Sequence, residues 1–200
     1  MYIPDAFHLD DRAALLSHAA RHPFATLITA GHDGVRVSHL PLLVDERLLR
    51  GHLARENPQL AHFAASVEVL SIFHGAHGYV SPSVYTDPQG GVPTWNYVVV
   101  HARGRARVVD EVALRAILSD SVDYFDATGW RPPEDEASLR PKLEAIAGFE
   151  IAIEHLEGKW KVSQNRSPAD QARVADWLER GDDASRALAQ IMRSRLGSVP

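Results

Sequence analysis

Successive β-rich runs, joined by hairpin turns and not separated by helices, limit the folds open to this chain. Residues 24–29 and 35–40 are rich in β-branched and apolar side chains, and the segment between them has glycine at 31 and 34. This pattern predicts a β-hairpin. The sequence as a whole predicts a β-rich α+β fold with an antiparallel barrel, since alternating βαβ units need a helix after each strand. Further predicted strands lie at 48–53, 67–73, 97–109, 149–155 and 160–162.

Three segments are predicted to interrupt the strands. Gly75 and Gly78 follow the strand at 67–73, and a turn is expected at 156–159. The segment 81–94 is rich in Pro, Gly and Ser, and its length indicates a functional loop.

Helical patterns flank the strands and fill the C-terminal part of the chain. Asp10, Asp11, Asn57 and Ser167 are suited to the starts of helices, because their side chains can accept hydrogen bonds from free backbone N–H groups. We expect a barrel domain over 1–163 and a helical extension over 164–200 that packs on it. The predicted helices cover 9–21, 57–64, 111–120, 136–147, 168–180 and 183–196.

Composition excludes several classes of protein. The 200 residues include no cysteine, which removes disulfides, thiolate catalysis and cysteine-bound metals, and fits a reducing cytoplasm. No apolar run approaches the roughly 18 residues of a membrane span, and the first residues lack a signal-peptide pattern. We therefore expect a cytoplasmic protein without membrane contact. A net charge of −5 with no run of Lys or Arg makes direct, specific DNA binding doubtful.

The common motifs for nucleotides, metals and nucleophiles are missing. Neither GxGxxG nor GxxxxGK[ST] occurs, so a phosphorylated cofactor would need discrete side chains. His74 and His77 form an HxxH pair between glycines without the helical frame of a zinc site, and no metal is expected. Ser81 and Ser83 lack a GxSxG context, which leaves catalytic residues unknown.

Six blocks of sequence carry a resemblance to a known family. They are Met1-Tyr2-Ile3-Pro4, Ser38-His39-Leu40-Pro41-Leu42, Leu49-Arg50-Gly51-His52-Leu53-Ala54-Arg55-Glu56-Asn57-Pro58-Gln59, Tyr79-Val80-Ser81-Pro82, Val92-Pro93-Thr94-Trp95-Asn96-Tyr97 and Gly158-Lys159-Trp160-Lys161-Val162-Ser163-Gln164-Asn165-Arg166. The last two blocks are the most specific. In this order the blocks resemble the FMN-binding negative transcriptional regulator family, often called PaiB-like.

The resemblance implies an FMN-binding split β-barrel with inserted and C-terminal helices. It also implies a homodimer with the flavins at the subunit interface and a role as a negative transcriptional regulator. One departure concerns the loop before Val92, which is short, and Val84, which stands where relatives tend to carry Trp. An aromatic wall of the flavin pocket is therefore expected to be missing.

FMN needs donors for its phosphate, an apolar or aromatic slot for its ring and donors for the ring's polar edge. One candidate cluster lies where a strand passes into a helix N-terminus, whose partial positive charge favours an anion. On residue types alone, a structural interpretation as surface charges and a strand histidine is favoured over a functional one, and the resemblance reverses this preference in favour of the phosphate. The cluster is Arg50, His52, Arg55 and Asn57, and Ser38 and His39 on the neighbouring hairpin strand complete a phosphate or ribityl shell.

Two further groups suit the ring. Trp95 offers a flat aromatic surface and Asn96 an amide for the polar rim, although a tryptophan is more often part of the core. Lys161, Gln164 and Arg166 lie in a segment without acidic residues, which is either a solvated turn or a donor set that reaches the flavin across the dimer interface.

Three functions remain open at this point. The first is a flavin-binding regulator whose cofactor occupancy biases contacts with a protein partner. The second is an FMN-dependent oxidoreductase of a small substrate, and the third is haem binding or degradation, which the 11 histidines permit. The absence of an evident general acid or base favours the first. The C-terminal helices mix Arg with Asp and Glu, a pattern typical of a docking pair and not of a DNA-reading module.

Overall fold

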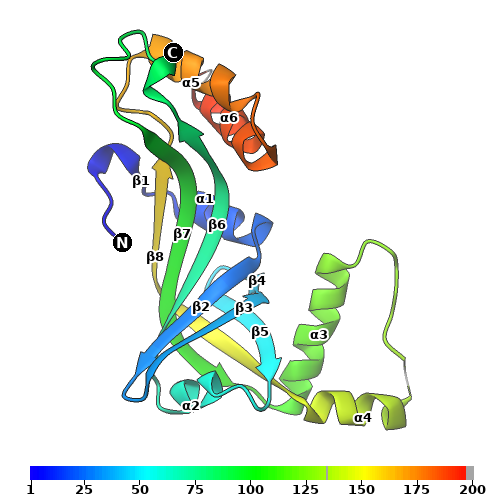
Figure 1. Ribbon diagram of the computed structural model, residues 1–200. Coiled ribbons are helices and arrows are strands. Elements are labelled where there is room, and N and C mark those ends of the chain that lie inside the picture. The colour runs from blue at the N-terminus through cyan, green and yellow to red at the C-terminus, as the bar shows by residue number, and fades with distance from the viewer. Residues whose placement is uncertain (134, 197–200) are drawn as a thin grey trace. The chain divides into compact units, whose positions relative to one another are not determined.

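The structure, a computed structural model, describes residues 1–133 and 135–196 (Figure 1). Two groups of helices stand out, one inserted between the seventh and eighth strands and one at the C-terminus, as the sequence predicts. The helices are α1 (Arg12–Arg21), α2 (Gln59–Ala64), α3 (Glu111–Phe125), α4 (Glu136–Glu144), α5 (Pro168–Leu178) and α6 (Asp183–Leu196), with 3-10 helices η1 (Asp5–Phe7) and η2 (Pro82–Val84). The strands are β1 (His8–Leu9), β2 (Phe24–Gly31), β3 (Gly34–Pro41), β4 (Leu43–Val44), β5 (Leu48–Ala54), β6 (Glu68–Val80), β7 (Thr94–Val108) and β8 (Ile146–Lys161).

One sheet contains all the strands of the described residues. Their order is β3-β2-β6-β7-β8-β5-β4, and β1 pairs with β8. Strands β2 and β3 pair antiparallel from Phe24 and Pro41 down to Gly31 and Gly34, which confirms the predicted hairpin. Gly34 at the turn has a φ of 109°, a conformation that favours glycine.

The chain forms two compact units. The first unit comprises residues 1–15, 74–100 and 157 onward, and the second comprises residues 16–73 and 101–156. Strands β6, β7 and β8 each contribute residues to both units. The sequence predicts a different division, with a boundary after residue 163, and this division stays a prediction. The last four residues of the predicted C-terminal extension, 197–200, lie outside the described residues.

Each unit has its own apolar core. In the first unit α5 and α6 lie side by side (Figure 1), and their inner faces pack with residues of β6, β7 and η2. Leu178, Leu188 and Met192 are at most 2% exposed there. In the second unit the rings of Phe63 and Phe149 pack 5.1 Å apart between centroids.

Two strands run further than the sequence predicts. Strand β6 continues through Gly78 to Val80, and β8 continues through 156–159 without a turn. At Gly78 a Cβ would lie 2.5 Å from Leu178 Cδ2, and at Gly158 it would lie 2.1 Å from Leu15 Cδ2. These glycines permit close packing inside strands, so reading them as breaks was wrong.

Side-chain caps explain where several helices begin. Asp110 and Asp135 accept hydrogen bonds from backbone N–H groups three residues later, at the starts of α3 and α4. Ser167 accepts from the N–H of Asp170, which confirms the predicted cap of α5. Helix α1 begins at Arg12 and not at Leu9, because Leu9 pairs with Gly158 in the sheet.

Candidate functional site

The predicted cofactor residues divide between the two units, and each group has its own contacts. The second unit holds Ser38, His39, Arg50, His52, Arg55 and Asn57, and the first unit holds Trp95, Asn96, Lys161, Gln164 and Arg166.

Ser38 and Asn57 meet in the second unit. Asn57 Nδ2 donates to Ser38 Oγ at 3.0 Å, and Asn57 Oδ1 accepts from the backbone N–H of Gln59 at 2.9 Å. The amide therefore joins β3 to the start of α2. His39 lies on the exposed side of the hairpin, with its Nδ1 3.2 Å from the Thr26 hydroxyl. Ser38 and Asn57 thus offer a hydroxyl and an amide near the start of α2, whereas the His39 imidazole lies on the opposite face of β3, beside Thr26.

The two arginines of this cluster already have partners. Arg50 donates to Asp45 at 2.7 Å and to Asp120 at 2.6 Å, and the hydrogen bond to Asp120, more than any other cause, raises its pKa. Arg55 donates through Nε to the Glu144 carbonyl oxygen at 2.7 Å and through Nη2 to that of Ile146 at 2.6 Å. Arg55 thereby joins the end of β5 to the passage from α4 into β8, and its Nη1 donors take no part in these contacts.

His52 is half-buried, and burial lowers the pKa of its imidazole. Its side chain lines a hollow of about 630 Å³ beside α3 and α4. This environment favours the neutral form of the imidazole.

In the first unit Lys161 fixes the start of β7. Its Nζ donates to the Trp95 carbonyl oxygen at 2.6 Å and to the Thr94 hydroxyl. Burial first, and then the positive charge of Lys159, lowers the pKa of Lys161. Among the described residues no carboxylate pairs with Lys161, and one of its three donors is left over. An anion bound beside Lys161 would favour the charged ammonium, and would thus offset the effects of burial and of Lys159 on its pKa.

An aromatic surface stands beside this lysine on the same unit. Trp95 is 54% exposed, and its ring centroid lies 6.0 Å from that of His77 and 6.1 Å from that of Tyr79. Trp177 Nε1 donates to the Tyr79 carbonyl oxygen at 3.1 Å. These four side chains, with Arg180 and Asp182, line a hollow of about 340 Å³.

Sequence reasoning missed most of this surface. It treated His77 only as half of a metal pair in a loop, whereas His74 and His77 both lie in β6. No three His, Asp or Glu side chains within the described ranges are placed to share a metal ion. Trp177 follows Arg173 at helical spacing along α5, and Arg180 comes two residues after the helix ends. This spacing of polar and aromatic residues was the available signal.

The other three predicted residues of this unit make internal contacts. Asn96 is 1% exposed, and its Nδ2 donates to Ser163 Oγ at 2.8 Å. Gln164 closes a loop by donating to the Trp160 carbonyl oxygen and accepting from the Val162 N–H. Arg166 lies over a ring, with its guanidinium carbon 4.5 Å from the Tyr85 centroid. Their roles toward a cofactor stay predictions.

Val84, which stands where relatives tend to carry Trp, is covered by the core of the first unit. Val84 is half-buried against the core of the first unit, and its carbonyl oxygen accepts from Arg173 Nε at 2.9 Å. Tyr85, beside it, is 3% exposed. The exposed aromatic side chains around the hollow are Tyr79, Trp95 and Trp177, and none of them belongs to the loop that carries Val84.

A model of the family described as "Putative FMN-binding domain" matches residues 1–155. The chain belongs to this family. The predicted family and the predicted cofactor, FMN, are thereby confirmed. The chain is also 30% identical over 205 residues to "Protease synthase and sporulation protein PAI 2" of Bacillus subtilis, covering 98% of each chain.

Two solved structures of other proteins have a similar fold. The "FAD and Heme binding protein" of Mycobacterium smegmatis aligns with a TM-score of 0.63 and 18% identity, over 77% of this chain and 73% of that one. The "Flavocytochrome Anf3" of Azotobacter vinelandii aligns with a TM-score of 0.62 and 16% identity, over 77% of this chain and 69% of that one. These likenesses confirm the predicted split barrel and show the fold alone. Within the described residues, no helix has the length and apolar character needed to cross a membrane.

The chemistry of the first unit fits an FMN group. Trp95 and Tyr79 present exposed aromatic surface suited to a flat ring. Lys161 and Thr94 place an ammonium and a hydroxyl beside it, with no acidic partner for the lysine among the described residues. When bound, FMN supplies a ring that takes up and releases electrons. The protein residues supply binding, orientation and charge.

Proposed function

We propose that this protein is an FMN-binding homodimeric regulator, in which flavin binding at the subunit interface controls contacts with a protein partner. Two sets of residues hold the cofactor in this proposal. Trp95, Asn96, Lys161, Gln164 and Arg166 serve its ring and its anionic edge, and Ser38, His39, Arg50, His52, Arg55 and Asn57 serve its phosphate and ribityl chain.

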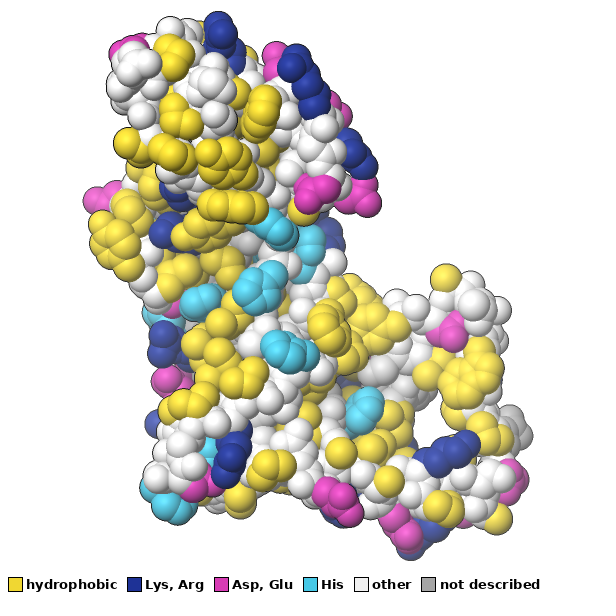
Figure 2. Space-filling view, viewed as in Figure 1, with side chains coloured by type: hydrophobic (Ala, Val, Ile, Leu, Met, Phe, Trp, Pro, Cys, Tyr) yellow, Lys and Arg dark blue, Asp and Glu magenta, His cyan; other side chains and the backbone are white. Residues whose placement is uncertain are grey.

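The observation that carries the dimer is an apolar sheet face in the second unit. Phe24, Val35 and Val37 are 66%, 62% and 52% exposed. Ile28 is half-buried and lies opposite Val37 on β3 and Leu70 on β6, so these side chains share one face. Hydrophobic side chains gather over β2 and β3 in Figure 2, with histidines beside them. An apolar face of this kind marks an interaction surface, and a second copy is the partner that symmetric association provides.

The dimer is tested by light scattering at micromolar concentration with FMN present. We expect a dimer for the wild type and a monomer for Val37→Asp, because a carboxylate in the centre of an apolar interface is left without a partner. Val112→Asp is the matched control, since Val112 is 79% exposed on α3 and lies outside this face. A monomeric wild type would reject the dimer.

The cofactor role of Lys161 is tested by titrating FMN into apoprotein. Lys161→Met is expected to weaken FMN binding by about tenfold or more, because it removes a charge-assisted contact. Arg195→Met, an exposed change at the end of α6, is the control and should leave FMN affinity unchanged. Unaltered FMN affinity in Lys161→Met would remove Lys161 from the proposed site.

The regulatory part of the proposal does not involve specific DNA contacts. The net charge is −5, and two arginines of α6 pair with acids, Arg186 with Asp183 and Arg193 with Asp176 and Glu179. We expect only non-specific DNA binding, with a dissociation constant of about 10⁻⁴ M or weaker at physiological salt. A salt titration with random and promoter duplexes measures this. Sub-micromolar, sequence-selective binding would contradict it and favour a direct repressor.

A further inference from the structure

Two lysines near the end of β8 bring positive charge into the first unit. Lys159 and Lys161 are two residues apart in the strand, so their side chains leave it on the same face. Lys159 is 9% exposed, and Lys161 is half-buried. A lysine is rarely buried to the extent of Lys159 unless its charge is paired.

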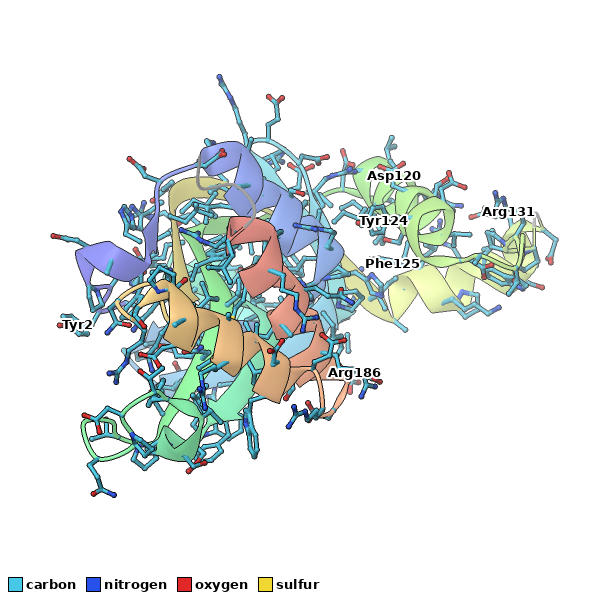
Figure 3. The ribbon with its side chains drawn as sticks, turned by 90° about the horizontal axis from the view of Figure 1, so that it is seen from above. Tyr2, Asp120, Tyr124, Phe125, Arg131 and Arg186 are labelled. Atoms are coloured by element: carbon cyan, nitrogen blue, oxygen red, sulfur yellow. The ribbon has the colours of Figure 1, made fainter. Side chains whose placement is uncertain are left out.

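Lys159 has no such pairing. Among the described residues no carboxylate forms an ion pair with it, and the nearest acid along the strand, Glu157, pairs with the N-terminal ammonium of Met1 at 2.5 Å. Lys159 Nζ donates to the Tyr2 carbonyl oxygen at 3.2 Å and lies 5.7 Å from the Tyr2 ring centroid and 5.4 Å from that of Tyr97. Figure 3 labels Tyr2 beside the N-terminal segment. The two aromatic faces stabilise the ammonium in part, but they leave its charge uncompensated.

The charges of the two lysines act on each other. Burial first, and then the charge of Lys159, lowers the pKa of Lys161. Lys161 Nζ donates to the Trp95 carbonyl oxygen at 2.6 Å and to the Thr94 hydroxyl, so one of its donors is left over. Two like charges that are close together and partly buried favour the binding of an anion, which offsets both their repulsion and their burial.

The surroundings of Lys161 indicate what kind of anion fits. Trp95, whose carbonyl oxygen Lys161 binds, presents a ring that is 54% exposed. An aromatic surface of this kind suits a flat ligand. The lysine pair and Trp95 together therefore suit a flat ring that carries negative charge on one edge.

FMN has such a ring in only one of its two stable states. The oxidised ring is neutral, whereas the two-electron reduced ring is an anion once its N1 proton is lost. A fixed positive charge stabilises the anion by a Coulomb interaction and has little effect on the neutral ring. Two uncompensated ammonium groups therefore distinguish the two states by charge.

We propose that Lys159 and Lys161 make the site selective for the reduced, anionic ring of FMN, so that the redox state of the flavin regulates how tightly it is held. Lys161 contacts the anionic edge of the ring, and Lys159 acts on the same edge through its charge. The inference rests on the proposed flavin-binding function and adds its regulation. Since that function links flavin binding to a protein partner, contacts with the partner then follow the redox conditions.

The proposal is tested by titrating apoprotein with oxidised FMN and, without oxygen and with dithionite present, with reduced FMN. At about pH 8 we expect the reduced form to bind about tenfold more tightly or better. A tenfold ratio places the midpoint potential of bound FMN about 30 mV above that of free FMN for a two-electron couple. Equal affinities, or tighter binding of oxidised FMN, overturn the proposal. If neither form binds, the flavin-binding function itself is rejected together with its regulation.

Variants of Lys159 test the role of its charge. Lys159→Met should reduce the preference for reduced FMN by about fivefold or more and leave the affinity for oxidised FMN nearly unchanged. Lys159→Arg keeps the charge and should keep the preference. Lys142→Met is the matched control, because Lys142 is an exposed lysine on α4 of the second unit. Equal effects of Lys159→Met on both forms would show that Lys159 supports only the fold. If thermal unfolding shows that Lys159→Met does not fold, Lys159→Gln makes the same test.

A second measurement requires no flavin. The chain contains three lysines, so the side-chain NMR signals of Lys161 can be assigned and its pKa measured in the apoprotein. Lys159→Met should raise this pKa because the repulsion from Lys159 is lost, whereas Lys159→Arg should leave it unchanged. An unchanged pKa in Lys159→Met would show that the two charges do not act at one place, and would overturn the proposal.

Riboflavin distinguishes the ring from the phosphate, because it has the same ring and no phosphate. The proposal expects riboflavin to show the same preference for the reduced state, and Lys159→Met to lower that preference as it does for FMN. If Lys159→Met instead weakens FMN in both states and leaves riboflavin unchanged, the lysines hold the phosphate. That result overturns the proposal while leaving flavin binding intact.

Discussion

Arg50 on β5 and Asp120 on α3 form an ion pair of 2.6 Å, although 70 residues separate them in the sequence. Arg50 also donates to Asp45 at 2.7 Å, and its side chain is 19% exposed. One guanidinium therefore links the inserted helix to the sheet. Partial burial screens this pair less than a fully exposed one.

This link is expected to contribute measurably to stability. In a double-mutant cycle with Arg50→Met and Asp120→Asn, urea unfolding should give a coupling energy of about 0.5–1.5 kcal/mol. The Arg105–Glu154 pair is the control, since its side chains are 57% and 46% exposed, and its coupling should stay below about 0.5 kcal/mol. Equal couplings for the two pairs would contradict the importance of burial.

Buried His18 makes stability depend on pH. Burial, followed by the charges of His22 and Arg21, lowers the pKa of His18 from 6.5 to about 4. The unfolded chain thus binds a proton that the folded chain does not, and stability falls as pH drops from 6.5 towards 4. The melting temperature of His18→Leu should fall less between pH 7 and pH 5 than that of the wild type. His32→Leu, an exposed change, should retain the wild-type dependence.

Asp33 governs a separate acid range. Hydrogen bonds from His62 first, and then from Arg36, lower its pKa from 3.8 to about 2. Because the folded pKa is depressed, the stability that the carboxylate provides is present above about pH 4 and is lost as pH falls through 2. Asp33→Asn should lower stability at pH 7 and flatten the loss below pH 4, as followed by circular dichroism. Asp87→Asn, in the loop between β6 and β7, is the control and should keep the wild-type loss of stability below pH 4. If Asp33→Asn loses stability below pH 4 as steeply as the wild type, Asp33 is not the group responsible.

Substitution of Arg55 distinguishes a structural role of this side chain from a role in cofactor binding. Removing it breaks two hydrogen bonds to carbonyl oxygens, so Arg55→Ala should lower stability by about 1–3 kcal/mol. If its Nη1 donors also reach the phosphate, the variant binds FMN about tenfold or more weakly and riboflavin almost normally. Titration of both flavins decides this. An equal loss for FMN and riboflavin would assign Arg55 to structure or to the ring.

Local chemistry made several features of this protein predictable from sequence. The hairpin of β2 and β3 follows from its alternation and from Gly34, which can adopt the positive φ of the turn. The start of α5 follows from Ser167, whose hydroxyl serves the first free N–H groups. Family membership and FMN follow from blocks of residues that are specific together. The hairpin, the helix start and each sequence block are determined by residues that lie close together in the sequence.

Tertiary packing determined what the sequence left open. Gly78 and Gly158 looked like strand breaks, but side chains far along the chain, at Leu178 and Leu15, fill the space that a Cβ would need. From the sequence, Arg50 and Arg55 had no evident partners. In the folded chain Arg50 donates to Asp120, and Arg55 donates to the carbonyl oxygens of Glu144 and Ile146. Trp177 joined Tyr79 and Trp95 only through the packing of α5 on β6. The reason is physical: hydrogen bonds and van der Waals contacts act over a few ångströms in space, and sequence distance carries little information about them.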